Sequence, residues 1–169
     1  MNRLRDVFAT INELEQERLI QSYALGGALA ALFYAEVSRT YDVDVFVLMD
    51  VDEGKIVSLE SIYAWCRKKG FDYRDEHLLI YGVPVQILVA GEGLHADAVR
   101  NAAILDYEGV PVRVMTPEFL LGLYLTAGGS KRRERAMTLL VGGAVDFDAL
   151  KHIWGKYQLP LTLLPTEYR

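Results

Sequence analysis

The apolar run from Asp42 to Met49 is the segment that most constrains the fold. Its alternating valines and its length are typical of a buried β-strand. Side chains alternate between the two faces of a strand, so Asp42 and Asp44 share one face with α-carbons about 6–7 Å apart. Acids at the head of a buried strand are costly unless they bind something, and one or two divalent cations would suit this pair.

A glycine pair lies upstream of these acids, at Gly26-Gly27. It interrupts the short apolar run Ser22 to Leu25, which favours a strand, and it precedes Ala28 to Val37, which favours a closely packed helix. Glycine lets backbone N–H groups approach a ligand, and a helix start carries partial positive charge, so this turn suits a phosphate. The sequence therefore predicts a triphosphate on the glycine turn, with its metal held by the acids. A plain tight turn and a solvated strand end remain open as alternative interpretations.

The remaining patterns predict an α+β fold, with helices crowded toward the end of the chain. We expect one structural unit with an α/β core over residues 1–115 and a helical part over residues 116–169 packed on that core. The expected helices are Arg3 to Gln21, Ser58 to Lys69, Ala96 to Ala103, Phe119 to Ala127, Ser130 to Val141 and Phe147 to Tyr157. The further expected strands are Leu78 to Tyr81, Val85 to Val89, Ile104 to Tyr107 and Val110 to Met115.

Composition narrows the classes of function. The single cysteine, Cys66, permits no intrachain disulfide and fits a reducing compartment. The longest uncharged stretch, Leu19 to Ala35, is too short to span a bilayer, and the N-terminal residues lack a signal-peptide pattern. We therefore expect a cytoplasmic protein that does not enter a membrane. The formal charge of −5 argues against tight nonspecific binding of nucleic acid, although a local basic cluster at 131–135 stays compatible with phosphate or RNA.

Two stretches together resemble the signature of the nucleotidyltransferase superfamily, which has the polymerase-β-like fold. They are Ala24-Leu25-Gly26-Gly27-Ala28-Leu29-Ala30 and Arg39-Thr40-Tyr41-Asp42-Val43-Asp44-Val45-Phe46-Val47. The later Thr116-Pro117-Glu118-Phe119-Leu120 helix start also has a counterpart. The resemblance is greatest to the small bacterial branch that includes toxin–antitoxin nucleotidyltransferases, and it covers about Gln21 to Leu140.

This resemblance implies transfer of a nucleoside monophosphate from an NTP to a protein or RNA acceptor, with Mg²⁺ (or Mn²⁺) as cofactor. Asp42 and Asp44 match the first two metal-binding carboxylates, and Gly26 and Gly27 match the phosphate-binding turn. Thr40 matches a small hydroxyl residue before the acids. The other residues that we assign to nucleotide binding are Arg39, Lys131 and Arg132. A cognate toxin or antitoxin is a candidate partner.

The sequence departs from the family pattern at three places. The strand that would supply the third carboxylate reads Val85-Gln86-Ile87-Leu88-Val89, which puts the uncharged Gln86 at that position. Tyr124 occupies the place of a frequent lysine, and the acid expected in the later helix is displaced or missing, because that helix reads Lys131-Arg132-Arg133-Glu134-Arg135-Ala136. A loop acid, Glu92 or Asp97, could substitute for the third carboxylate. These departures favour a second hypothesis, in which the fold serves as a nucleotide-binding or protein-interaction module with weakened catalysis.

Overall fold

The computed structural model describes residues 3–50 and 56–169. Most of the acidic turn expected at Asp50 to Gly54 lies outside the described residues. The described α-helices are α1 (Arg3–Gln16), α2 (Gly27–Leu32), α3 (Glu60–Lys68), α4 (Leu94–Arg100), α5 (Pro117–Ala127), α6 (Ser130–Val141) and α7 (Phe147–Lys156). The described strands are β1 (Ser22–Leu25), β2 (Val43–Leu48), β3 (Asp72–Arg74), β4 (His77–Ile80), β5 (Val83–Val89), β6 (Ala103–Tyr107) and β7 (Val110–Val114).

The described strands form one mixed sheet in the order β3-β4-β5-β2-β1-β7-β6. β2 lies near the middle, antiparallel to β1 and parallel to β5, and β1 is parallel to β7. The outer pairs β3–β4, β4–β5 and β6–β7 are antiparallel. This mixed sheet with its helices confirms the α+β fold class.

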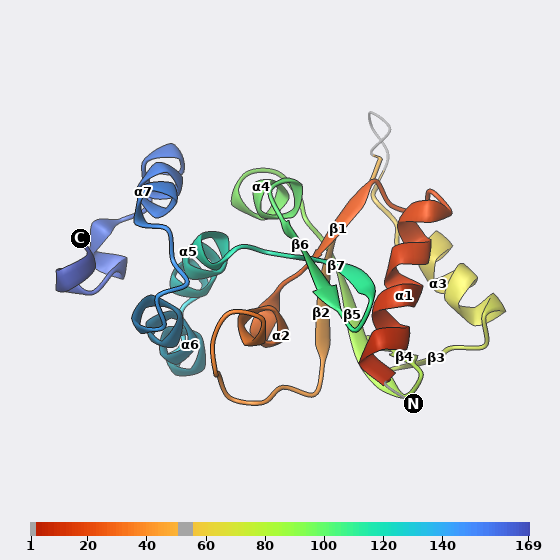
Figure 1. The fold of residues 1–169 in the computed structure, drawn as a ribbon. Helices are drawn as coiled ribbons and strands as arrows, with labels where there is room; N and C mark the ends of the chain where they lie inside the picture. Colours follow the sequence, from red (N-terminus) through yellow and green to blue (C-terminus); the bar gives the residue numbers. More distant parts are fainter. Residues whose placement is uncertain (1–2, 51–55) are drawn as a thin grey trace.

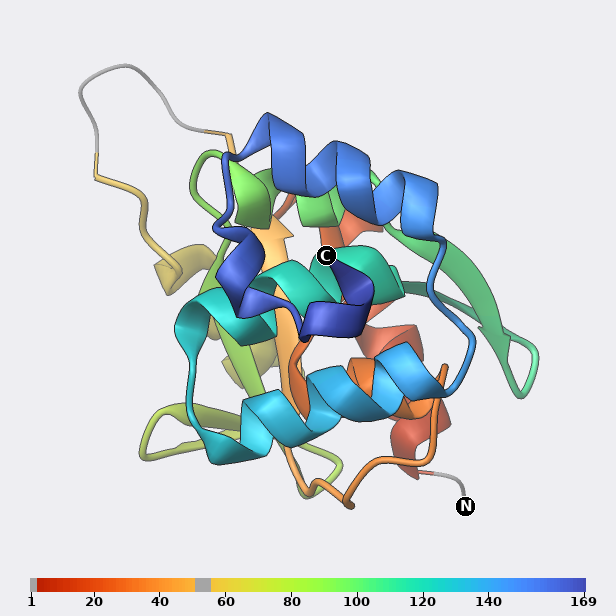
Figure 2. The same cartoon turned by 90° about the vertical axis from the view of Figure 1, so that its left-hand side faces the viewer.

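Helices cover both faces of the sheet (Figure 1). α1 and α3 lie on one face, while α2 and α4 lie on the other, with α5 beyond them. α6, α7 and the C-terminal turns lie outside α5, as the rotated view also shows (Figure 2). The valines of β2 are fully buried on one face of the strand. The alternation predicted for this strand is therefore confirmed, and the acids are left on the face toward α2, α5 and α6.

Several helix ends differ from the sequence prediction. α1 ends at Gln16 rather than Gln21, because the chain turns at Arg18, which adopts a positive φ of 57°. α2 ends at Leu32 rather than Val37 and is only six residues long. α3 begins at Glu60 rather than at Ser58, and Ser58 does not hold its N-cap position. Leu59 holds the N-cap position without a side-chain bond, and the Ser58 hydroxyl accepts a hydrogen bond from the Glu60 N–H.

The strand β3 was not predicted, because its three residues are exposed and carry no apolar alternation. It pairs with β4 at one edge of the sheet. Of the predicted strands, the two on either side of Gly82 and the two on either side of Glu108-Gly109 each form an antiparallel hairpin. Their turns place Tyr81-Gly82 and Glu108-Gly109 at positive φ, which matches two-residue loops of the left-handed type.

The helical part after Met115 packs on the core through α5. Pro117 opens α5, as predicted, and the helix is buried on most sides. The buried Glu118 accepts a hydrogen bond from the Asp146 N–H through Oε1 (2.7 Å), which ties the start of α5 to the start of α7. A division of the chain near residue 115 stays a prediction. Within the described residues, we find no helix with the length and apolar character needed to cross a membrane.

Candidate active site

A cleft of about 620 Å³ opens between the sheet and the helices α2, α5 and α6. β2 and β5 form its floor, α2 and α5 form one wall, and the first turns of α6 close one end. Its lining residues are Gly27, Ala28, Arg39, Thr40, Tyr41, Asp42, Asp44, Phe46, Gln86, Leu88, His95, Leu120, Leu123, Tyr124, Ala127, Lys131, Arg132 and Arg135. The cleft thus contains both predicted aspartates and a face of the basic helix.

The two aspartates differ in environment. Asp42 precedes β2 and is exposed, and its Oδ1 accepts a hydrogen bond from the Thr40 hydroxyl (2.9 Å). Asp44 lies within β2 and is half-buried. Burial is the main cause that raises the pKa of Asp44 above its ordinary value, and the nearby Asp42 carboxylate adds to the rise. A cation beside both carboxylates would relieve this cost.

The glycine turn lies directly against Asp44. Gly27 adopts φ +58°, and a Cβ at this position would stand 2.9 Å from Asp44 Cγ and closer still to Oδ2. The preceding Gly26 donates its N–H to the Asp44 carbonyl oxygen (3.0 Å), so that amide already has a partner. Gly26 is the N-cap of α2 but does not line the cleft. The structure therefore brings the glycine turn and the aspartates together, with Gly27 as the member that faces the cleft.

Tyr124 has a structural contact at this turn. Its hydroxyl, at the cleft wall on α5, donates a short hydrogen bond to the carbonyl oxygen of Gly27. Burial raises the pKa of Tyr124 well above its ordinary value, so the phenol stays neutral. A lysine at position 124 would add a positive charge. Tyr124 instead supplies a hydrogen bond that holds the start of α2 against α5.

Gln86 occupies the third position beside the aspartates. In the parallel pairing of β2 with β5 it stands opposite Asp44, on the strand predicted to carry the third carboxylate. Within residues 3–50 and 56–169, no three histidine, cysteine, aspartate or glutamate side chains are grouped to hold a metal ion. Among the described residues, Asp42 and Asp44 are the carboxylates that line the cleft, and Gln86 does not supply the third carboxylate that the resemblance implies.

The loop acids do not replace the missing carboxylate. The Asp97 carboxylate accepts hydrogen bonds from Lys156 (2.7 Å), Tyr157 and Arg100 (3.0 Å), away from the cleft. Glu92 is exposed and does not line the cleft. The alternative that one of them completes the site is therefore wrong. Asp97 is hydrogen-bonded to Lys156 and Tyr157 at the end of α7, and Glu92 lies outside the cleft.

The predicted basic residues Arg39, Lys131 and Arg132 line the cleft. Among the described residues, no ion pair joins Arg39 to either aspartate. The structure adds Arg135, which belongs to the basic cluster at 131–135 but was not among the residues assigned to nucleotide binding. It follows Lys131 by four residues, and this helical spacing is the signal that could have placed both on one face.

The far end of the cleft is uncharged. Phe46 and Leu88 are opposite each other one step beyond Asp44 and Gln86, and the His95 ring stacks on Phe46 with centroids 5.8 Å apart. The period of two along β2 could have placed Phe46 on the face of the acids. The position of His95 depends on how α4 packs, which no local pattern showed.

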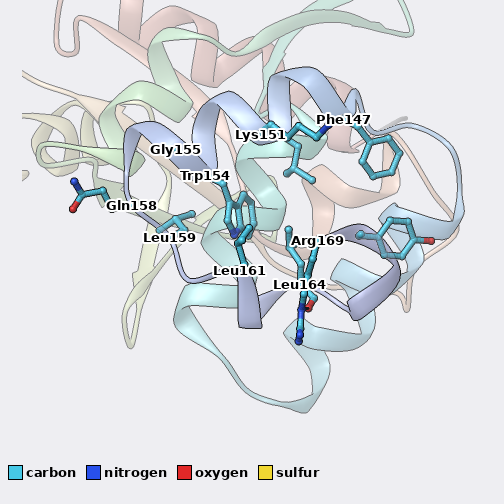
Figure 3. Close-up of a pocket in the computed structure, with 11 residues that line it drawn as sticks. Phe147, Lys151, Trp154, Gly155, Gln158, Leu159, Leu161, Leu164 and Arg169 are labelled. Carbon is cyan, nitrogen blue, oxygen red and sulfur yellow. Dashed lines mark hydrogen bonds between the residues drawn. The ribbon is translucent and has the colours of Figure 1, made fainter.

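A second hollow, of about 440 Å³, lies between α7 and the C-terminal turns (Figure 3). Trp154 lies among its lining side chains, and the Trp154 indole N–H donates to the Pro160 carbonyl oxygen (3.3 Å). Among the described residues, its lining includes no aspartate or glutamate. It therefore lacks the ligands for a metal-bound phosphate, and the cleft above β2 is the better candidate site.

The fold is similar to that of solved nucleotidyltransferase-like proteins. No protein-family model and no curated protein sequence matches the chain. An antigenic nucleotidyltransferase-like protein from Paracoccidioides brasiliensis has a similar structure, with a TM-score of 0.60 and 17% identity over 93% of this chain and 89% of its own. ANT(2'')-Ia in complex with adenylyl-2''-tobramycin gives a TM-score of 0.54 and 14% identity over 92% of this chain and 97% of its own. The solution structure of the antibiotic-resistance factor ANT(2'')-Ia gives a TM-score of 0.51 and 13% identity over 94% of this chain and 93% of its own. These similarities show the fold.

Proposed function

We propose that this protein is a metal-dependent nucleotidyltransferase, which moves a nucleoside monophosphate from an NTP to an acceptor hydroxyl. One observation carries the proposal: the Gly27 turn contacts the Asp44 carboxylate inside a cleft that the basic face of α6 also lines. Phosphates and a divalent cation are the ligands that such a combination suits.

In this proposal the acidic residues bind the metal, and the basic residues bind the phosphates. Asp42 and Asp44 would hold the divalent metal, Mg²⁺ or Mn²⁺, which supplies positive charge beside the α-phosphate. The Gly27 backbone and the side chains of Lys131 and Arg132 would bind the phosphate oxygens, with Arg39 at the mouth. The acceptor oxygen forms a bond to the α-phosphorus while the bond from that phosphorus to pyrophosphate breaks. The hydroxyl proton passes to solvent, because Gln86 is a poor proton acceptor.

The acceptor class is open to direct test. A protein or an RNA is our first candidate, including a cognate toxin or antitoxin in the cytoplasm. The adenylyl group in the ANT(2'')-Ia complex is carried by tobramycin, so small hydroxylated compounds belong in the same test.

The test is to incubate the protein with Mg²⁺ and each α-³²P-labelled NTP, then to measure pyrophosphate release and label transfer to lysate components or small acceptors. We expect transfer that Asp42→Asn or Asp44→Asn abolishes. Asp148→Asn on α7, outside the cleft, serves as the control. If neither the metal nor any NTP binds, the proposal is wrong.

The second candidate is a nucleotide-binding or protein-interaction module with weakened catalysis. The observation that favours it is Gln86 opposite Asp44, where a carboxylate would complete the site. Nucleotide binding without turnover would support this candidate. A gain of transfer in Gln86→Asp would then show that the rest of the site is assembled.

A further inference from the structure

The charges that line the cleft are unequal. Four cationic side chains and two carboxylates line the cleft, so the formal charge of its lining is +2, although the whole chain carries −5. The cations are Arg39, Lys131, Arg132 and Arg135, and the anions are Asp42 and Asp44. An NTP near neutral pH carries a charge of about −4, which one divalent cation lowers to about −2. The cleft therefore matches an NTP with one cation, and a second cation would leave positive charge uncompensated.

Gln86 is one reason why the cleft carries a net positive charge. It stands opposite Asp44 in the β2–β5 pairing and presents an amide instead of a carboxylate. A neutral amide oxygen can still contact a cation but brings no charge to offset it. A second divalent ion on the Gln86 side of Asp44 would therefore lack an anionic ligand of its own.

Arg135 lines the same cleft and carries an unsatisfied hydrogen-bond donor. The residue is half-buried on α6, and its Nε is buried with no hydrogen-bond partner among the described residues. Its charge acts on Asp44 and on Tyr124, yet it forms no ion pair with Asp44. A buried donor without an acceptor is costly, and a phosphate oxygen is the acceptor that a guanidinium binds best.

We propose that the site takes a single divalent cation, between Asp42 and Asp44, and that the Arg135 guanidinium supplies the positive charge that a second cation would place beside the transferred phosphate. This inference rests on the proposed function and adds the number of ions and the role of Arg135. The ligand class is an NTP that carries one cation.

The first test counts ions. The full chain is titrated with Mn²⁺ in the presence of a non-hydrolysable α,β-methylene NTP, and bound Mn²⁺ is measured by electron paramagnetic resonance. We expect one ion per chain in the wild type and in Gln86→Asn, and two in Gln86→Asp. Two ions in the wild type would overturn the inference and leave the proposed function standing. No bound ion would overturn both.

The second test isolates Arg135. We expect Arg135→Gln to weaken binding of the Mn²⁺–NTP analogue at least tenfold, and Arg135→Lys to restore part of the loss. Arg133→Gln is the matched control, because Arg133 is on the same helix but lines a different hollow. In the Gln86→Asp background, where a second ion can bind, the loss caused by Arg135→Gln should shrink at least threefold. An equal loss in both backgrounds would show that Arg135 does not stand in for an ion.

Discussion

Gly27 is the residue at which this site tolerates least change. It combines a positive φ with a missing Cβ against the Asp44 carboxylate, so an alanine would have to displace one or the other. We expect Gly27→Ala to weaken Mn²⁺ binding at least tenfold and to lower the melting temperature, measured by spectroscopic titration and thermal unfolding. The backbone strain alone accounts for about 1–2 kcal/mol.

Gly109→Ala provides the comparison for this substitution. Gly109 has a similar φ of +81°, but a Cβ there meets nothing within 4 Å. This variant should therefore show the backbone cost without any change in Mn²⁺ affinity. Unchanged Mn²⁺ binding in a folded Gly27→Ala protein would contradict the close approach seen in the structure.

Asp44 should destabilise the metal-free protein at neutral pH. Burial and Asp42 raise the pKa of Asp44 above 3.8, so the folded state binds its proton more tightly than the unfolded state does. Stability therefore falls as pH rises above about 4 through the raised pKa. We expect Asp44→Asn to raise the melting temperature at pH 7 without metal and to have little effect near pH 3.

The control for this prediction is the same comparison with Mg²⁺ present. The cation binds the ionised carboxylate, so it should stabilise the wild type more than Asp44→Asn. A variant that melts below the wild type at pH 7 without metal would show that Asp44 is satisfied by the fold alone.

At the scale of elements, Asp97 joins α4 to α7. Its hydrogen bonds, first from Lys156 and next from Tyr157, lower the pKa of Asp97 to about 2. A lowered pKa gives stability that is present above the unfolded value of 3.8 and is lost as pH falls toward 2. We expect Asp97→Asn to lower the melting temperature at pH 7, with the difference from wild type shrinking as pH falls through about 2. Asp148→Asn, at an exposed position on α7, is the matched control.

Local patterns predicted most elements, and they failed where tertiary contacts decide. The alternation of β2 and the proline at the start of α5 are local signals, and both were confirmed. β3 has no signal of its own, because it exists only through pairing with β4 at the sheet edge. α1 was predicted too long because nothing local marks the left-handed turn at Arg18.

At the scale of the whole molecule, the sequence predicted that the glycine turn and the aspartates lie near each other. It did not predict which residues of α4 and α6 complete the cleft. The glycine turn and the aspartates are joined by a short segment, so their meeting could be predicted. His95 on α4 and Arg135 on α6 are far from the aspartates in sequence. Whether they line the cleft depends on how these two helices pack around it. No period within one segment specifies that packing.

The net charge of the whole molecule and the charge of the cleft have opposite signs. The effect of salt on nucleotide binding therefore shows which of the two charges acts on the nucleotide. If the net charge of −5 dominated, an anionic nucleotide would be repelled and added salt would strengthen its binding. If the basic face of α6 dominates, salt should weaken binding, because the screening length falls from about 10 Å at 0.1 M to about 3 Å at 1 M. We expect weakening, measured by calorimetry with the non-hydrolysable NTP analogue and Mn²⁺. Lys131→Gln should flatten this dependence and Arg133→Gln should leave it unchanged, whereas tighter binding at high salt would place the phosphates away from α6.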